Sequence, residues 1–266
     1  MIYMTPEYEV ESLPYYPLNN ARILWDNVLA SATFTATSEI EGFEAANAQA
    51  TDTASWWWPS VAGTLTMTLS GAASISSVGI AAHSLGGEGV GVTVQGLVGA
   101  TWTTLHPEIV PDDNSAMMIM FASVTVTAVR LILDGSARIG VVYAGSEMIM
   151  PQRVYTAAPP LSMVISTEYQ TNKSQTGQFM GRSIMANARP FDVSWTHLHE
   201  TWVRSDFYPF ILAARRDPFF VALRPAGYPD DVGYVWTSSD IVPARMGLKD
   251  FIEVQVSGTA HVEPDL

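Results

Sequence analysis

Residues 31–83 read SATFTATSEIEGFEAANAQATDTASWWWPSVAGTLTMTLSGAASISSVGIAAH and decide the fold class. Small β-forming residues come first, a connector rich in turn residues follows, and β-forming residues then return. From Ala21 to about Met150 the expected strands follow one another at short intervals, separated by Gly, Asp and Asn, with almost no 3.6-residue periodicity. This spacing predicts a mainly β protein built as a sandwich or barrel.

The composition supports a folded, turn-rich protein. Hydrophobic residues make up 48% of the 266 residues and charged residues 15%, with 19 Gly and 16 Pro, which argues against disorder. The length suffices for two domains that each bury a core. The chain has no Cys, so disulfides, thiolate metal sites and cysteine nucleophiles are excluded.

Charge is distributed unevenly along the chain. Residues 1–150 hold 3 Arg, no Lys and 14 acidic residues, whereas residues 151–266 hold 10 basic and 12 acidic residues. Such an acidic first half would repel a phosphate backbone, so we expect no sequence-specific binding of nucleic acid. The simpler explanation of the acidic charge is solubility.

Prolines and changes in composition predict four segments. Residues 1–20, with Pro6, Pro14 and Pro17, are expected to form an extended arm that clasps a neighbouring subunit. Residues 21–150 are expected to form the first β domain and residues 151–160 a proline-rich linker. Residues 161–266 are then expected to form a second β-sandwich with a flanking short helical segment.

The sequence offers no convincing membrane span or secretion signal. Residues 116–133 are apolar, but Ser and Thr alternate with Val and Ala at period two, and Arg130 interrupts the run. This pattern favours half-buried strands over a lipid-facing helix. Residues 1–10 contain neither a basic nor a long apolar region, so we expect synthesis and folding in a cytoplasm.

Residues 197–216, HLHETWVRSDFYPFILAARR, form the one region expected to be helical. Leu198, Trp202 and Val203 would share one face of a first short helix. Pro209 would end it, unless Asp206 caps a second helix that has Pro209 in its first turn.

Four stretches give residues 21–150 a resemblance to the discoidin family of galactose-binding-like jelly rolls. They are TATSEIEGFEAANAQATDTASWWWP (35–59), LTMTLSGAASISSVGIAAH (65–83), VTVQGLVGATWTTL (92–105) and VTAVRLILDG (126–135). Ser70 stands where the family usually has glycine. The resemblance covers about 110 residues in the right order, and it implies a discoidin-like jelly roll that acts as a binding or assembly module.

Further stretches resemble minor tail proteins of long-tailed bacteriophages: LNNARILWDNVLASATFTATSE (18–39), FDVSWTHLHETWVRSDFYPF (191–210) and DPFFVALRPAGYPDDVGYVW (217–236). The latter two are similar in layout to tail-tube and distal-tail domains. This resemblance implies a homo-oligomeric ring, a hexamer or a trimer, with tail tube and hub proteins as neighbours. It also implies a place in the virion tail after synthesis in the host cytoplasm.

Aromatic residues are the candidate ligand-binding residues. In an extended chain Trp57 would point to one side and both Trp56 and Trp58 to the other, so one side must be core. Either all three are structural, or at least one contacts a saccharide, because aromatic faces stack on sugar rings. His83 and Trp102 are further candidates for the same rim.

Asp52 is the candidate metal ligand. The galactose-binding-like resemblance implies a cation site at this position, built largely from backbone carbonyls, so a structural Ca2+ is considered although no cofactor is expected. Calcium prefers six to eight oxygen ligands. The alternative is that Asp52 caps a local turn.

No catalytic constellation is found. In His197-x-His199-Glu200 the spacing differs from that of a zincin helix, and residues 86–91, GGEGVG, lack the Lys-Ser/Thr of a phosphate loop. We therefore expect no enzyme. The sequence favours a structural tail-tip protein, ring-forming through its second domain with the jelly roll outside, and the alternative is a module that recognises carbohydrate on a host surface.

Overall fold

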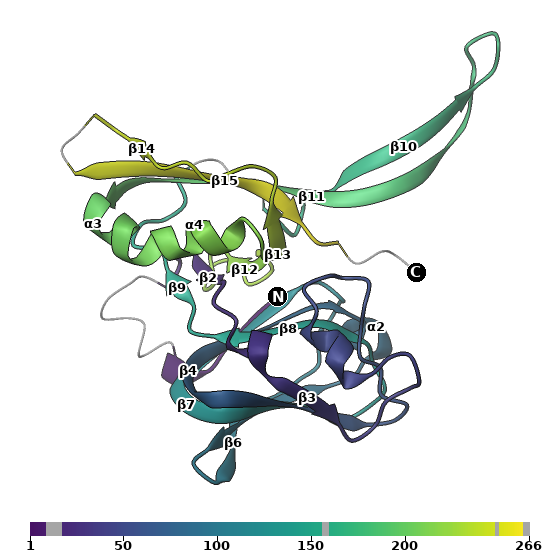
Figure 1. Ribbon diagram of the computed structural model, residues 1–266. Helices are drawn as coiled ribbons and strands as arrows, with labels where there is room; N and C mark the ends of the chain where they lie inside the picture. The colour runs from purple at the N-terminus through teal and green to yellow at the C-terminus, as the bar shows by residue number, and fades with distance from the viewer. Residues whose placement is uncertain (9–17, 156–159, 248–249, 263–266) are drawn as a thin grey trace.

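The computed structural model describes residues 1–8, 18–155, 160–247 and 250–262 (Figure 1). Two β-sheets dominate the described chain, and one short helical segment lies near the C-terminal end. The predicted mainly β class is confirmed. Residues 9–17 of the predicted arm and 156–159 of the predicted linker lie outside the described residues.

The first sheet forms the jelly roll. It consists of β1 (Ile2–Met4), β3 (Thr33–Ala36), β4 (Gly63–His83), β5 (Val92–Val98), β6 (Thr101–Ile109), β7 (Met117–Leu133) and β8 (Ile139–Gly145). The first part of β4 pairs with β3 and its last part with β8, while β7 pairs with β1 near its start and with β5 near its end. Because both long strands change neighbours, the sheet folds over and encloses a core that includes Trp57, Leu65 and Leu131.

Residues 117–133 form strand β7, so the predicted β structure of this run is confirmed, but as one long strand where two were expected. Within the ranges described, no helix is long and apolar enough to cross a membrane.

The second sheet has the order β10-β11-β15-β13-β12-β2-β9, with β14 on β15. Its strands are β2 (Arg22–Leu24), β9 (Met148–Ile149), β10 (Ser166–Lys173), β11 (Phe179–His199), β12 (Phe219–Ala222), β13 (Val232–Thr237), β14 (Ala244–Arg245) and β15 (Phe251–Ala260). Short helical elements among the described residues include η1 (Val28–Ser31), η2 (Ala45–Gln49), α2 (Leu85–Glu88), α3 (Glu200–Trp202), η3 (Val203–Phe207) and α4 (Tyr208–Ala214).

The predicted helical region starts later than expected and runs without a break from 200 to 214. Leu198 lies in β11, and Pro209 lies in the first turn of α4. The five residues of η3 form a π-helical turn directly before it, with its backbone in helical conformation throughout, so Pro209 does not break the run and Asp206 does not cap a second helix.

The second sheet is covered on both faces. Along β12, Phe219 and Val221 pack with the helical segment 200–214, while Phe220 and Ala222 pack against the jelly roll. This is the period-two alternation of a strand. The contact with the jelly roll is close, because a Cβ added to Gly79 would lie 2.7 Å from the ring of Phe220.

The jelly roll is inserted into the second sheet. Arg22–Leu24 and Met148–Ile149, both placed in the first domain by the sequence analysis, pair with each other, and Arg22–Leu24 also pairs with β12. All three residues of β2 are buried, since one face meets the helical segment and the other meets the jelly roll. The second sheet is therefore built from segments that precede and follow the jelly roll in the sequence.

The start of the chain packs on the chain itself. Ile2–Met4 form β1 parallel to β7, and the backbone N–H of Thr5 donates to the carbonyl of Met120 at 3.0 Å. These residues were expected in an arm that reaches a neighbour. In the single chain the edge of β7 satisfies the backbone groups of residues 2–5, and the clasp on a neighbouring subunit stays a prediction.

Candidate functional site

The tryptophan triplet divides as the alternation predicted. Trp57 is fully buried in the jelly-roll core, and its indole Nε1 donates to the carbonyl of Ser38 at 3.0 Å. Its backbone forms a β-bridge with Ile139. Trp56 and Trp58 are half-buried on the other side of this segment.

Phe43 joins these two tryptophans in what we call the loop aromatic cluster (Phe43, Trp56 and Trp58). The rings of Phe43 and Trp56 are stacked with centroids 5.8 Å apart and planes 8° apart, and Trp58 meets Phe43 edge-on at 5.6 Å. The backbone N–H of Trp58 donates to the carbonyl of Phe43 at 3.1 Å, and its indole N–H donates to Ser136 Oγ at 3.0 Å. These bonds hold the rings in place, so the cluster is preorganised.

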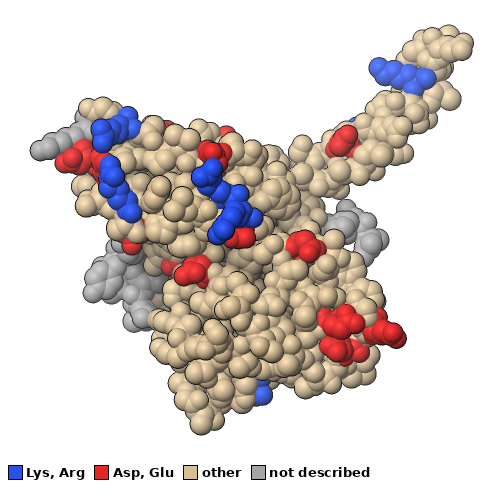
Figure 2. Space-filling view, viewed as in Figure 1, with Lys and Arg blue, Asp and Glu red and all other residues tan. Residues whose placement is uncertain are grey.

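Arg138 adds a cation to the loop aromatic cluster. Its guanidinium carbon lies 5.2 Å from the centre of the Trp56 ring, while Phe43 stacks on the same ring. The indole Nε1 of Trp56 is buried and has no hydrogen-bond partner among the residues described. Three exposed acidic residues lie close to Phe43 in the chain: Glu39, Glu41 and Glu44. Figure 2 shows acidic side chains gathered on this side of the jelly roll.

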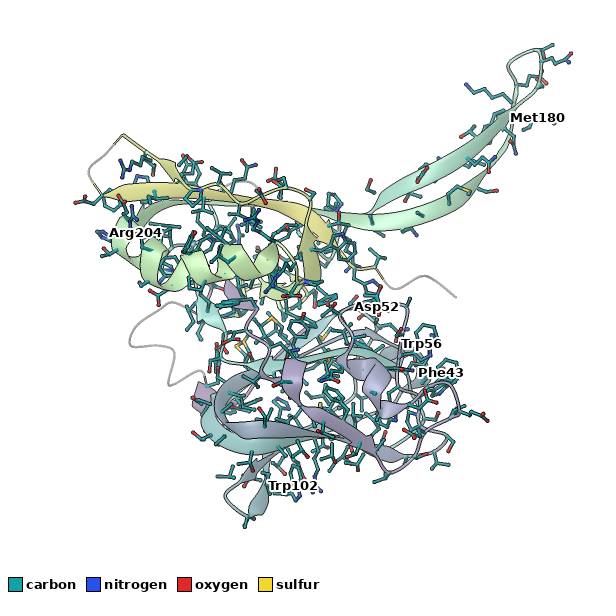
Figure 3. All side chains as sticks on the ribbon, viewed as in Figure 1. Phe43, Asp52, Trp56, Trp102, Met180 and Arg204 are labelled. Carbon is teal, nitrogen blue, oxygen red and sulfur yellow. The ribbon has the colours of Figure 1, made fainter. Side chains whose placement is uncertain are left out.

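The structure does not bring the other two ligand candidates to this cluster. His83 is fully buried, and its Nε2 lies 2.9 Å from the carbonyl oxygen of Ser115, so a ligand on the surface cannot reach it. Trp102 lies at the far end of the jelly roll from Phe43 and Trp56 (Figure 3). There the guanidinium carbon of Arg130 lies over the Trp102 ring, 4.2 Å from the ring centre.

Asp52 lies in a turn. Its Oδ1 accepts hydrogen bonds from the backbone N–H groups of Ala54 at 2.9 Å and Ser55 at 2.8 Å, which is the turn-capping alternative. The preceding residue, Thr51, accepts a 2.7 Å hydrogen bond from the hydroxyl of Tyr234 in the second sheet. In the described ranges no three His, Asp or Glu residues are grouped as a metal site would require. Calcium binding built on carbonyls here stays a prediction.

The His197-x-His199-Glu200 motif is occupied by local contacts. Both imidazoles pack against Phe251, with centroids 5.8 and 4.9 Å from its ring. Glu200 pairs with Arg204, whose hydrogen bond is the main cause that lowers the pKa of this carboxyl.

Sequence reasoning missed a long β-hairpin, formed by β10 and residues 179–188 of β11. It projects away from both sheets (Figure 1). Nearly all of its side chains are exposed, and several are large and apolar: Tyr169, Phe179, Met180, Ile184 and Met185. A two-stranded hairpin that stands alone in water is marginally stable, and exposed apolar surface of this kind is typical of a site of association.

One face of the hairpin carries a defined apolar pair. Tyr169 and Ile184 are directly opposite in the register, so their side chains share a face. Arg182, two residues from Ile184, stacks on Tyr169 with its guanidinium carbon 4.0 Å from the ring centre. Gln170 and Ser183 pair on the other face. The distal part also carries Met180, which lies near the tip (Figure 3).

A sequence signal for the hairpin exists. Residues 166–173 and 179–186 are β-forming and are separated by a short polar segment that contains Gly177, which adopts φ 82°. What the sequence does not mark is the exposure, because Thr, Ser and Gln alternate with Tyr, Ile and Met as they would in a half-buried strand.

No protein-family model and no curated protein matches this sequence. Solved structures do align with part of the chain. One is a family 32 carbohydrate-binding module of a Clostridium perfringens glycoside hydrolase in complex with GalNAc-β-1,3-galactose. The two sequences are 17% identical, and the alignment covers 46% of this chain and 99% of that chain with a TM-score of 0.40. A second is the family 32 module of C. perfringens NanJ in complex with galactose, with 15% identity, 47% of this chain, 98% of that chain and a TM-score of 0.41.

A third is a chitosan-binding module of a chitosanase/glucanase from Paenibacillus sp. IK-5, with 19% identity, 44% of this chain, 97% of that chain and a TM-score of 0.39. Each alignment thus covers nearly the whole module and less than half of this chain. The aligned proteins are carbohydrate-binding modules.

Proposed function

We propose that this chain is a non-catalytic structural protein that assembles with further copies of itself and displays its jelly roll on the outside. The setting that the sequence resemblance favours is the tail tip of a long-tailed bacteriophage. There the second sheet would form a ring of six or three subunits, with the tube and hub proteins as neighbours. The protein would be made in the host cytoplasm and reside in the virion.

The hairpin is the observation that carries this proposal. Its apolar side chains, Ile184 at 61%, Phe179 at 65% and Met180 at 67% exposure, are left in water by the single chain. Residues 166–188 therefore gain free energy if another subunit covers them. Another copy of the chain suits this role, because a repeated heterologous contact closes a ring in which each hairpin covers the next subunit.

The test is the native mass of the full chain by light scattering, with and without calcium. The matched variants are Tyr169→Ser with Ile184→Ser on the apolar face, and Gln170→Ala with Ser183→Ala on the other face. We expect a multiple near six or three for the wild type and the second pair, and a lower mass for the first pair. A wild-type monomer, or an unchanged mass in the first pair, would contradict the proposal.

Carbohydrate binding by the jelly roll is the second candidate function. It is favoured by the loop aromatic cluster, whose half-exposed rings are fixed by backbone hydrogen bonds and lie beside Arg138. Because the exposed residues Glu39, Glu41 and Glu44 lie close to Phe43 in the chain, the cluster would select a neutral saccharide of a host surface over an anionic one. Such a function is compatible with assembly, since the jelly roll would present the glycan site.

A polysaccharide array tests this second function. Trp56→Ala should abolish binding, whereas Trp102→Ala, at the far end of the domain, should leave it unchanged. Circular dichroism of both variants confirms that the fold is kept. Equal binding by wild type and Trp56→Ala would remove the loop aromatic cluster from consideration.

A further inference from the structure

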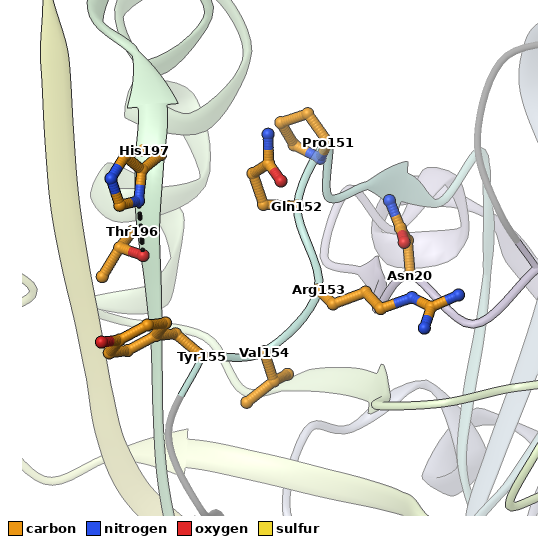
Figure 4. A pocket seen from close by; sticks show the side chains of 8 residues that line it. All are labelled: Asn20, Pro151, Gln152, Arg153, Val154, Tyr155, Thr196 and His197. Atoms are coloured by element: carbon orange, nitrogen blue, oxygen red, sulfur yellow. Dashed lines mark hydrogen bonds between the residues drawn. The ribbon is translucent and has the colours of Figure 1, made fainter.

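A cavity of about 600 Å³, open to solvent, lies beside β11 of the second sheet and shares no residue with the loop aromatic cluster. The segment Pro151–Tyr155 forms one side, Thr196 and His197 of β11 form another, and Asn20 closes it (Figure 4). No function assigned above uses this cavity.

Hydrogen bonds fix the walls of the cavity at two points. The backbone N–H of Tyr155 donates to the carbonyl of Ser194 on β11 at 2.9 Å. At the other end, the side-chain Nδ2 of Asn20 donates to the carbonyl of Met150 at 2.8 Å. The segment between them is thereby held open beside β11, so the cavity is preformed.

Asn20 is the buried residue of the cavity wall. The residue is only 2% exposed, and its Oδ1 accepts no hydrogen bond from the part of the chain that the structure describes. Leaving a buried acceptor unpaired costs about 1–3 kcal/mol, so such an atom is rare in native proteins without a functional reason. Because this atom has almost no accessible surface, a water enclosed behind the wall of the cavity would supply the donor.

His197 is a sign of a binding site. Its φ of 58° lies in the left-handed region, which residues other than glycine seldom adopt, and it falls in the bulge between Trp195 and Leu198. Thr196 Oγ1 lies 3.0 Å from His197 Nδ1 and orients the ring at the cavity. Backbone strain of this kind concentrates at binding sites.

The lining defines the chemistry of the ligand. Arg153 supplies a permanent positive charge, and none of the eight lining residues is acidic, although the chain carries a formal net charge of −13. Gln152 is exposed and offers an amide, whereas the polar atoms of Asn20 and Thr196 bond within the protein. Tyr155 is 70% exposed, so its ring is accessible for stacking on a ligand.

We infer that this cavity binds a sugar unit that carries a carboxylate. In this arrangement the Arg153 guanidinium pairs with the carboxylate, Tyr155 stacks on the C–H face of the ring, and the amide of Gln152 bonds to a hydroxyl. The charged residue that lines this cavity is basic, whereas the exposed charged residues close to Phe43 of the loop aromatic cluster in the chain are acidic. The inference does not depend on the proposed ring or on glycan binding by the jelly roll.

Saturation-transfer and titration NMR of the full chain test it with matched probes. D-glucuronate and D-galacturonate are compared with D-glucose and D-galactose, which lack only the carboxylate, and with acetate, which lacks the sugar. We expect at least one hexuronate to bind at millimolar concentration, at least tenfold more tightly than its neutral counterpart and than acetate. Failure of both hexuronates to bind, or acetate binding as tightly as they do, would overturn the inference.

Variants test whether the hexuronate binds in this cavity. Arg153→Gln and Tyr155→Ala change exposed side chains and should each weaken hexuronate binding about tenfold, the loss of roughly 1.4 kcal/mol. Arg216→Gln and Tyr228→Ala, also exposed but outside the cavity, are the matched controls and should bind as the wild type does. Unchanged binding in both Arg153→Gln and Tyr155→Ala would refute the assignment, and Trp56→Ala should have no effect.

Discussion

The hydroxyl of Tyr8 donates to Glu147 Oε1 at 2.6 Å, across 139 residues of sequence. The same hydroxyl accepts a 3.0 Å hydrogen bond from Nε of Arg22, which is fully buried in β2. Glu147 also accepts from Ser76 Oγ of the jelly roll. One phenol thus links a strand of the second sheet to the jelly roll.

Replacing this phenol should destabilise the protein. Tyr8→Phe leaves the buried Nε of Arg22 without its acceptor, so we expect the free energy of unfolding to fall by about 1–3 kcal/mol. Urea unfolding measures the change. Tyr155→Phe, which removes an exposed hydroxyl, is the control, and a loss of less than about 0.5 kcal/mol in Tyr8→Phe would show that the link contributes little.

The contact between the sheets should not tolerate a methyl group. In Gly79→Ala the new Cβ would lie 2.7 to 2.8 Å from three ring atoms of Phe220, which is itself fully buried. We expect a loss of about 1–3 kcal/mol from this overpacking. Gly71→Ala has nothing within 4 Å of the added carbon and serves as the control. Equal stability of both variants would mean that the two sheets separate readily.

Alkaline pH should weaken the same contact. Burial raises the pKa of Tyr143 from its ordinary value of 10 to about 12, while its hydroxyl donates to the carbonyl of Pro218 at 3.0 Å. The folded protein therefore favours the protonated phenol. The resulting stability is present in full below pH 10 and is lost as the pH rises towards 12. Urea midpoints across this range should fall less steeply in Tyr143→Phe, and parallel slopes would contradict the assignment.

Two neighbouring tryptophans should respond differently to substitution. Trp57→Ala removes a fully buried ring from the jelly-roll core and should cost about 3–5 kcal/mol, whereas Trp56→Ala removes a half-buried ring and should cost less. Thermal unfolding of both variants measures this difference. A larger loss in Trp56→Ala would mean that the loop aromatic cluster, and not Trp57, holds the loop.

The hairpin should be dispensable for folding of the single chain. A variant in which residues 167–187 are replaced by Asn-Gly keeps all three hydrophobic core clusters, since none of them contains a residue of this segment. We expect its unfolding midpoint to match that of a wild-type sample diluted below its assembly range. A midpoint several degrees lower would show that the hairpin supports the fold itself.

The sequence predicted most strands because their alternation is local. The run 116–133 and the buried position of Trp57 both follow from period two. The insertion of the jelly roll could not be predicted in this way, because β2 and β9 contain three and two residues, too few to show a period, and their pairing joins distant parts of the chain.

The candidate site was predicted only in part for the same reason. Trp56 and Trp58 were named, but Phe43 and Arg138 reach them through the fold. His83 looked available because its carbonyl partner, Ser115, lies 32 residues away. The cavity at Asn20 draws on three separate segments, none of which has a motif of its own.

The insertion of the jelly roll between β2 and β9 has a mechanical consequence. A domain joined to its neighbour by a single linker can rotate about that linker. The jelly roll is instead connected at both of its ends to adjacent strands of the same sheet. A pull on the jelly roll is divided between two covalent connections and passes directly into β12 through β2. The two connections fix the orientation of the jelly roll relative to the second sheet. A force or torque on the jelly-roll surface is therefore transmitted directly to the base of the hairpin.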